Sequence, residues 1–336
     1  MTTNTLKPVL IIGGSGVVGR RAVKALRRLQ PRLPIWIGGR DTHKAAALAR
    51  EIGLAEAVRI DLERDDLGLP PDADVSGVVV LLKDDTLRSL RYAQGRGVPY
   101  VSFSDFAFDI GPAVALHARH PTRAPVLLLG HFLGGVMTLV TLHLAREFKA
   151  VHSIEMGGVF DEEDVGGPAA SGDMERLTKG VPSPLIRHEG RFLWASEEVA
   201  TRVFHGVDGT AWTGRAYPLL DVPSLAAATD ANTVRIDFAV RPVARRPPGQ
   251  GPGLEVVIEI TGETPEGTTK RVRHALVDTE VHSGLSALGA ALATERLLGL
   301  AGGAPVAPGL YHPESVLDPA YVVERVRESG TRLWTM

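Results

Sequence analysis

The chain lacks cysteine altogether, and only 5% of its 336 residues are aromatic. Without cysteine it can form no disulfide bond, no thiolate zinc site and no CxxC redox pair, and it has no cysteine nucleophile. It also lacks an excess of charge of one sign, because 37 basic residues stand against 39 acidic ones. A formal net charge of -2 gives no overall field that would attract nucleic acid or an anionic membrane. We therefore expect neither as a partner.

The N-terminus lacks the basic and then apolar run of a signal peptide, and a strand-like run begins by Pro8. One stretch, Ala124 to Ala145, is apolar enough to raise the question of a membrane span. It contains Pro125, His131 and a glycine pair, however, which favour a buried strand, a turn and a buried helix. The sequence predicts a cytoplasmic protein without a membrane segment.

Up to about residue 147, short apolar runs alternate with amphipathic stretches. The predicted strands are Pro8 to Ile12, Leu33 to Ile37, Ala57 to Asp61, Gly77 to Leu82, Val98 to Phe103 and Pro125 to Leu129. The predicted helices between them include Val17 to Leu29, Thr42 to Ile52 and Asp85 to Gln94. Almost continuously apolar strands are typical of a parallel sheet covered on both faces. This half is predicted to be an α/β Rossmann domain, a doubly wound parallel sheet of about six strands.

After about residue 150, longer alternating runs follow one another without intervening helices. These predicted strands are Ser153 to Phe160, Arg191 to Ala195, Thr233 to Pro242, Leu254 to Gly262 and Thr268 to Val277. Arg245 to Gly253 is interpreted as a hairpin loop or a flexible connection. Two helices are expected at the end, Gly284 to Leu300 and a last one that begins at Asp318 and Pro319. The pattern indicates a second, α+β domain with a largely antiparallel sheet.

The first predicted strand leads straight into a glycine-rich turn. Gly14, Gly16 and Gly19 fit the GxGxxG pattern of dinucleotide-binding proteins between a strand and a helix. Glycine permits the tight turn, the approach of the backbone to a pyrophosphate and the close packing of the helix, whose N-terminus attracts anions. The alternative is a glycine turn without a cofactor. The predicted cofactor-binding residues here are Gly14, Ser15, Gly16, Val17, Val18 and Gly19.

The end of the second predicted strand lacks the carboxylate that NAD-specific sites use for the ribose hydroxyls. Arg40 stands near this position and offers a planar fork that can pair with a 2'-phosphate. Lys44, one helical turn further on, adds a second positive charge, and Asp41 is predicted to cap the helix. These residues favour NADP(H) over NAD(H). The alternative is that Arg40 and Lys44 are solvated charges at a helix start.

Two further loops are expected to lie along the cofactor, because ligands bind outside the carboxyl ends of parallel strands. Asp61 and Leu62 end the third strand and are predicted to flank the adenine. The alternative for Asp61 is a cap of the following turn. Leu82 ends the fourth strand and is predicted to bind the cofactor on its way to the nicotinamide.

Three side chains at the same edge are predicted to be catalytic. Lys83 is a candidate proton donor or clamp for a substrate carboxylate, the alternative being a surface charge. Asp105 follows the fifth strand together with Ser102 and Ser104. His131 follows the sixth, and its imidazole suits the proton exchange that accompanies hydride transfer. The alternative for His131 is a ring held by a backbone carbonyl beneath the second domain.

Other residues give less specific signals. Four residues of the second domain could reach a substrate carboxylate, although nothing in their spacing singles them out: Arg187, His188, Arg215 and Tyr217. Three aromatic residues are expected to exclude water from the site: Phe132, Trp194 and Trp212. The pair His117 and His120 is interpreted as part of a helix C-terminus, and no metal site is predicted. The Tyr-x-x-x-Lys pair, the GxSxG elbow and the Walker motif are missing.

These motifs together resemble the saccharopine dehydrogenase-like reductases, the relatives of saccharopine reductase, lysine 6-dehydrogenase and carboxynorspermidine dehydrogenase. The segments that carry the resemblance are Val9 to Gly19, Gly38 to Arg40 with Lys44, Gly97 to Asp105, and Pro313 to Val316 with the last helix. The resemblance implies a Rossmann domain, a middle domain often used for dimerisation, and C-terminal helices that return to the Rossmann half. It also implies NAD(P)-linked reduction of imines or oxidation of amino acids.

Two positions depart from the family pattern. Ser102 stands where similar enzymes usually have Asp, and His131 to Gly134 stand where they have a turn of small residues and proline. With the family organisation, we expect the Rossmann domain over residues 1–133, the substrate and dimerisation domain over 134–282, and C-terminal helices packing back on the Rossmann domain over 283–336.

The function predicted from the sequence is that of an NADP(H)-dependent oxidoreductase. It would act as a homodimer on a C=N or C=O group of a small, amino-acid-derived substrate. One alternative is an atypical short-chain-like reductase of carbonyl or enoyl compounds. Another is a regulator that senses NADP without catalysis.

Overall fold

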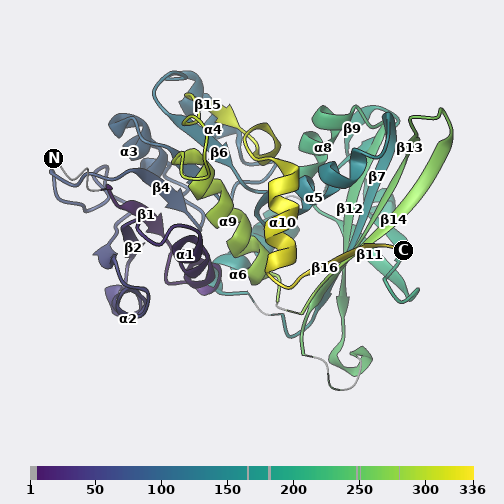
Figure 1. Ribbon diagram of the computed structural model, residues 1–336, viewed down its shortest axis with the longest axis horizontal. Helices are drawn as coiled ribbons and strands as arrows, with labels where there is room; N and C mark the ends of the chain where they lie inside the picture. The colour runs from purple at the N-terminus through teal and green to yellow at the C-terminus, as the bar shows by residue number, and fades with distance from the viewer. Residues whose placement is uncertain (1–5, 165, 181–182, 247–248, 250, 280) are drawn as a thin grey trace.

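Two sheets lie toward opposite ends of the molecule (Figure 1). The computed structural model describes residues 6–164, 166–180, 183–246, 249, 251–279 and 281–336. Among these residues, the first sheet, sheet A, has seven parallel strands in the order β15-β6-β5-β4-β1-β2-β3. Its strands are β1 (Val9–Ile12), β2 (Ile35–Gly39), β3 (Ala55–Arg59), β4 (Gly77–Val80), β5 (Tyr100–Ser102), β6 (Pro125–Leu128) and β15 (Gly309–Tyr311). The helices that connect them are α1 (Val17–Leu29), α2 (Thr42–Ile52), α3 (Arg88–Arg96) and α4 (Gly111–Ala118).

Sheet A confirms the predicted doubly wound fold. Every residue of β1, β4 and β6 is buried, as expected for parallel strands covered on both faces. The strand order reverses between β1 and β4, and the crevice outside such a switch point is where open α/β sheets bind ligands. Some boundaries differ from the prediction, since β3 begins two residues earlier and α3 begins at Arg88. The seventh strand, β15, comes from the C-terminal part of the chain and was not predicted.

Sheet B is largely antiparallel, as predicted, and its described part has nine strands. The main order is β10-β11-β12-β7-β13-β14-β16, and β8 pairs with both β12 and β9. The bounds are β7 (Ala150–Asp161), β8 (Leu185–His188), β9 (Arg191–Trp194), β10 (Thr201–His205), β11 (Ala211–Ala216), β12 (Thr233–Arg241), β13 (Leu254–Glu263), β14 (Thr269–Asp278) and β16 (Arg332–Thr335). Only the β7–β12 pair is parallel among these residues.

The hairpin interpretation of Arg245 to Gly253 is wrong, because β12 and β13 do not pair with each other. They lie on opposite sides of β7 and both pair with it. Pro247, Pro248 and Gln250 of this segment lie outside the described residues. The expectation of strands without intervening helices is also wrong. The helices found there are α6 (Pro168–Glu175), the π-helical turn η2 (Arg176–Gly180), α7 (Glu197–Ala200), α8 (Asp221–Thr229) and the short η3 (Val243–Arg245). Helix α5 (Val136–Ala145) precedes β7 and is the buried helix expected in the apolar stretch.

The C-terminal part of the chain joins the two halves. Helix α9 (Ser283–Leu297) packs along α1, and Gln30 donates a hydrogen bond of 2.6 Å to Glu295. Helix α10 (Pro319–Glu328) follows the short η4 (Pro313–Ser315) and packs on α5, beside α9 in Figure 1. Asp318 caps α10 as predicted, because its carboxylate accepts a hydrogen bond from the Ala320 N–H. The chain then ends in sheet B through β16, a strand that was not predicted.

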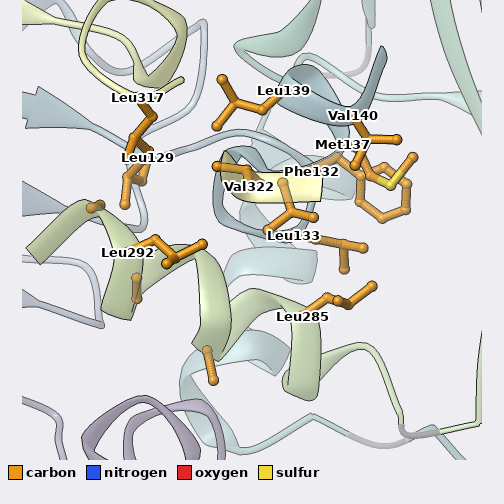
Figure 2. Close-up of a cluster of buried hydrophobic side chains, with 14 of the residues drawn as sticks. Leu129, Phe132, Leu133, Met137, Leu139, Val140, Leu285, Leu292, Leu317 and Val322 are labelled. Carbon is orange, nitrogen blue, oxygen red and sulfur yellow. The ribbon is translucent and has the colours of Figure 1, made fainter. Parts of the chain in front are cut away.

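The core between the halves centres on the short helix η1 (Phe132–Gly135), as Figure 2 shows. Leu133, Val140 of α5, Leu292 of α9 and Val322 of α10 gather there and are almost fully buried. Burial of one such side chain stabilises a protein by about 1.5–3 kcal/mol. Leu133 has φ 52°, in the left-handed region that favours glycine, so this packing holds a strained backbone in place. The apolar stretch Ala124 to Ala145 forms β6, η1 and α5. Within the described residues, none of the helices has both the length and the apolar character needed to cross a membrane.

Candidate active site

A cleft of about 870 Å³ lies between the carboxyl edge of sheet A and sheet B. Its lining runs from the glycine turn after β1, past Leu82 and Lys83 after β4, to Phe160 of β7 and Phe238 of β12. Helix α6 and η2 form a further wall. Because the turn after β1 and the loop after β4 flank the switch point of sheet A, the cleft has the position expected of a ligand site. We call its two ends the glycine end and the aromatic end.

The glycine turn brings α1 very close to β1. A Cβ atom at Gly19 would lie 2.1 Å from the Gly13 carbonyl oxygen, so only glycine lets the helix start here. A Cβ at Gly14 would lie 3.0 Å from the Ile11 carbonyl oxygen. Gly16 lines the cleft, whereas Gly14 is buried beneath the turn. The turn therefore has the shape that a dinucleotide pyrophosphate requires.

The N-terminus of α1 opens into the cleft. Gly16 gives the helix no side-chain cap, and the first turn carries no acidic residue. The first N–H groups of a helix have no partner within it, so those of Val17 and Val18, which line the cleft, can bind an anion. Helix α6 begins directly beside them, because a Cβ at Gly167 would lie 2.9 Å from Val17 Cγ2. Ser15, the remaining predicted residue of the turn, is half-buried and does not line the cleft.

Arg40 lines the glycine end of the cleft. It is exposed and forms no hydrogen bond or ion pair with any other described residue. Lys44 is exposed one turn into α2 and does not line the cleft. Asp41 caps α2, as predicted, by accepting a hydrogen bond from the His43 N–H at 2.8 Å. The carboxylate nearest to Arg40 in sequence is therefore already engaged with the backbone.

The predicted adenine residues lie outside the cleft lining. Asp61 is exposed, and its carboxylate accepts a hydrogen bond of 2.9 Å from the Glu63 N–H. This is the turn cap that the sequence offered as the alternative. Leu62 is half-buried beside it, and contact of either residue with adenine stays a prediction. Leu82, in contrast, lines the cleft directly next to Lys83.

Two of the predicted catalytic residues form one ion pair: Lys83, which lines the cleft, and Asp105, which is buried and does not. Lys83 Nζ lies 2.6 Å from Asp105 Oδ1 and 3.1 Å from Asp109 Oδ2. Burial works against the charge of Lys83, but these two carboxylates outweigh it and raise the pKa of the ammonium group. Ser102 donates its hydroxyl proton to the other oxygen of Asp105. The group is thus a charged donor fixed at the carboxyl edge of sheet A.

A second cation, Arg176 of η2, shares Asp109 with Lys83. Arg176 pairs with Asp109 and, at 2.8 Å, with Asp173 of α6, and it donates to the Ser104 carbonyl oxygen at 2.7 Å. Asp173 in turn accepts a hydrogen bond of 3.0 Å from the Ser104 hydroxyl. The segment formed by α6 and η2 is therefore fastened to the loop after β5 by charged groups. Its short, Gly- and Ala-rich sequence buries no residue of α6, so no periodic pattern could have revealed it.

His131, the third predicted catalytic residue, belongs to a separate network. Its Nε2 lies 2.8 Å from Ser224 Oγ and 3.3 Å from His312 Nδ1. Burial and the neighbouring His312 hold the pKa of His131 well below its usual value, so the ring is neutral near pH 7. Its Nδ1 is buried without a partner among the described residues. The backbone carbonyl of the alternative interpretation is not among the described partners of His131, since the ring contacts two side chains instead.

Asp221 supports the loop that carries His131. Its fully buried carboxyl group accepts hydrogen bonds of 2.6 Å from the Phe132 N–H and from the Thr138 hydroxyl. Burial raises the pKa of Asp221 to about 6, because no cation accompanies these neutral donors. Asp221 was not predicted as a site residue, because its place at the start of α8 gives no sign of this role in the sequence.

Four aromatic rings form the aromatic end: Phe132, Phe160, Tyr217 and Phe238. The rings of Phe132 and Phe238 are 4.7 Å apart, those of Phe160 and Phe238 are 5.4 Å apart, and Tyr217 lies 5.7 Å from Phe238. Gly158, which pairs with Phe238 across the sheet, makes room for them, because a Cβ there would lie 2.8 Å from Phe238. The sequence places Phe160 and Phe238 in two separate predicted strands. Only the pairing of β7 with β12 puts their rings together.

Several predicted residues lie away from the cleft. Trp212 is buried in a small core behind sheet B, and Trp194 is about half exposed on β9 outside the lining, so only Phe132 of the three expected aromatic residues is in place. Arg187 stacks on Phe192 and Arg215 pairs with Glu197. Of the four residues proposed to reach across the cleft, only Tyr217 lines it.

No protein-family model and no curated protein sequence matches this chain. Among solved structures, apo saccharopine dehydrogenase (L-Glu forming) from Saccharomyces cerevisiae is similar with a TM-score of 0.66 and 16% identity, over 98% of this chain and 100% of that one. GenD2 from gentamicin A biosynthesis, solved with NAD, has a TM-score of 0.46 and 16% identity over 100% and 98% of the two chains. A myo-inositol dehydrogenase from Corynebacterium glutamicum ATCC 13032 has a TM-score of 0.47 and 14% identity over 98% and 99%. The chain thus has a saccharopine dehydrogenase-like fold, which confirms the resemblance at the level of the fold.

Proposed function

We propose that this protein is an NADP-dependent oxidoreductase that transfers a hydride to or from a C=N or C=O group of a small molecule. One observation carries the proposal: at one edge of sheet A, the cleft joins an arginine that has no partner among the described residues, beside a glycine turn, to a charged lysine. The first pair of features suits the phosphates of a dinucleotide, and the lysine suits the proton that must accompany a hydride.

The residues of the glycine end fit such a cofactor. The turn leaves no space for a Cβ at Gly19, and Val17 and Val18, the first two residues of α1, line the cleft beside it. The guanidinium group of Arg40 has no partner in the described part of the chain and can pair with a 2'-phosphate, and the strand before it ends in glycine instead of a carboxylate. NADPH, when bound, supplies the hydride. The residues of the chain would orient the phosphates, and glycine at the end of β2 would keep a carboxylate away from the 2'-phosphate of the ribose.

Lys83 is assigned as the proton donor. Reduction of C=N or C=O places negative charge on nitrogen or oxygen as the hydride arrives on carbon, and a proton must follow. The Lys83 ammonium group is charged, lines the cleft and is held in one direction by Asp105. His131 is less suited to this step because its buried ring is neutral. We assign to His131 the positioning of the loop that carries Phe132.

Cofactor binding tests the proposal. Calorimetric titration should show that the wild-type protein binds NADPH at least tenfold more tightly than NADH. Arg40→Ala should remove most of this preference by weakening NADPH alone, because the lost pairing is made only with the 2'-phosphate. Arg119→Ala, an exposed arginine at the end of α4, is the matched control and should change neither affinity. Tighter binding of NADH than NADPH would refute the cofactor assignment. NADPH binding without oxidation by any ketone, aldehyde or imine would favour a sensor.

A homodimer through sheet B is a separate part of the proposal. Large apolar side chains are exposed on strands β9 and β10, among them Trp194 at 51% and Val203 at 59%. Exposed apolar clusters on edge strands are typical of subunit interfaces. Light scattering at micromolar concentration should give twice the mass of one chain, and Val203→Asp should shift the protein toward the monomer. A monomeric wild type would contradict this arrangement.

A further inference from the structure

We infer that the substrate held at the aromatic end is an uncharged, ring-bearing ketone or imine without a carboxylate group. The inference rests on the proposed function for its chemistry, but the binding preference can be measured without turnover. The sequence led us to expect an amino-acid-derived substrate, and the inference narrows this class to molecules without a carboxylate. Two independent features of the cleft carry it, the pairing of its cations and the rings that form its wall.

The first feature is charge. Among the described residues that line the cleft, Lys83 and Arg176 are the cations beyond the glycine end that are always charged. Asp109 lies between them, while Asp105 holds the other side of Lys83 and Asp173 the other side of Arg176. Three carboxylates therefore surround two cations. A substrate carboxylate would have to displace one of them and would meet the repulsion of the others.

The histidines of the lining add no free positive charge. Burial keeps the His131 ring neutral, and His282 lies 2.7 Å from Asp164, which is itself fully buried. Arg40 is the described lining cation without a carboxylate partner, and it follows β2 at the glycine end of the cleft. Among its described lining residues, the cleft thus has a cation without a partner where a phosphate would bind and none where the substrate would bind.

The second feature is the aromatic wall. Phe160, Phe238 and Tyr217 are half-buried, so parts of their rings face the cleft, and buried Phe132 closes the space behind them. Leu219 and Leu177 continue the apolar surface on either side. Phe238 contacts three of the other aromatic groups within 6 Å between ring centroids. A flat ring in a substrate can pack against such a wall edge-to-face or offset-stacked.

The reaction balances without a further reactant. NADPH gives a hydride to the C=N or C=O carbon and becomes NADP+, and the Lys83 ammonium group gives its proton to the nitrogen or oxygen. Water then returns a proton to Lys83. No step requires the substrate to carry a charge, in agreement with the lining of the aromatic end.

Matched probes test the substrate class. Phenylacetone and phenylpyruvate share a benzyl ketone and differ in the carboxylate, and pyruvate keeps the carboxylate without the ring. Calorimetric titration, with and without NADPH, should show phenylacetone binding at least tenfold more tightly than phenylpyruvate, and no saturable binding of pyruvate. Tighter binding of phenylpyruvate than phenylacetone would overturn the inference. NADPH oxidation by phenylpyruvate but not by phenylacetone would overturn it while leaving the proposed oxidoreductase function intact.

Two variants separate the contributions of wall and charge. Phe238→Ala should weaken phenylacetone at least tenfold and Phe238→Leu less, whereas Leu54→Ala, which changes an exposed apolar residue outside both the cleft and sheet B, should have no effect. Asp109→Asn keeps the acceptor for the Phe106 N–H but removes the charge shared by Lys83 and Arg176. It should shift the ratio of the two affinities toward phenylpyruvate by about tenfold. An unchanged ratio in Asp109→Asn would refute the role of the paired cations. Failure of NADPH to bind, with phenylacetone binding lost only in Phe238→Ala, would refute the oxidoreductase function and leave the ligand class standing.

Discussion

The glycine end and the aromatic end of the cleft treat charge in opposite ways. Arg40 at the glycine end is exposed and unpartnered among the described residues, beside helix N–H groups that have no partner within α1. Lys83 and Arg176 further along are each held between two carboxylates. A free cation binds an anion without losing an existing partner, whereas a paired cation must give one up. Cationic side chains therefore bind a ligand at the glycine end and hold the site rigid further along the cleft.

The largest effect is expected for Gly19→Ala, which disrupts the glycine end alone. In Gly19→Ala the new Cβ would lie 2.1 Å from the Gly13 carbonyl oxygen, so α1 must move away from the turn. NADPH affinity should fall by more than a hundredfold in calorimetric titration, while phenylacetone should still bind. Gly95→Ala in α3 is the matched control, because a Cβ there meets nothing within 4 Å. Unimpaired NADPH binding in Gly19→Ala would place the cofactor elsewhere.

Lys83→Met should give the next largest effect, at the boundary between the two ends. Loss of a general acid reduces the rate by about 10²–10⁴-fold. The turnover number with 2-phenyl-1-pyrroline and NADPH should fall by this factor, while NADPH affinity should stay within threefold of the wild-type value. Lys179→Met removes an exposed lysine of η2 and serves as the control. A drop in NADPH affinity equal to the drop in rate would show that Lys83 binds the cofactor and does not donate the proton.

The glycine end could be predicted from sequence in more detail than the aromatic end. A strand, a turn and a helix are contiguous, so Gly14, Gly16 and Gly19 together with the cap Asp41 determine the local geometry. The aromatic end is assembled from β7, β12, the segment after β11 and η1, and no local pattern shows that their rings meet. The same reason explains why β15 and β16 were missed, since they have three and four residues and pair only with strands distant in sequence. The short strands β8, β10 and β11 were missed as well, although β10 and β11 pair with each other.

Ion pairs between residues far apart in the sequence could not be predicted either. Lys83 was identified as a candidate because it follows β4, but its partner Asp109 lies beyond β5 and Arg176 lies in η2. Asp237 of β12 is fully buried, although it stands between the apolar residues Ile236 and Phe238 in an alternating run of the sequence. It is buried because Arg235 pairs with it at 2.6 Å and Arg202 covers it from β10. Burial of a carboxylate follows from such partners, which only the folded chain brings together.

The buried carboxyl group of Asp221 predicts a pH dependence of stability. Its pKa is raised from 3.8 to about 6 in the folded protein, so between these values the folded state binds more protons than the unfolded state. The free energy of unfolding should therefore fall as the pH rises from about 4 to 6, by up to about 3 kcal/mol, and this contribution should stay constant above that range. Asp221→Asn, which can still accept from the Phe132 N–H, should flatten the profile measured by urea unfolding. If the free energy of unfolding changed over this pH range by the same amount in the wild type and in Asp221→Asn, the raised pKa of Asp221 would be contradicted.

The smallest effect is expected for Gly158→Ala, which changes the aromatic end alone. A Cβ at Gly158 would lie 2.8 Å from Phe238 and 3.5 Å from Phe132, so Gly158→Ala must displace the Phe238 ring without abolishing the wall. Overpacking of this kind costs about 1–3 kcal/mol, and phenylacetone affinity should fall severalfold while NADPH affinity is unchanged. Gly172→Ala on α6 is the control, since its Cβ meets nothing within 4 Å although the residue lines the same cleft. Equal losses of both ligands in Gly158→Ala would mean that the two ends do not act separately, because a change confined to one wall would then have reached the other.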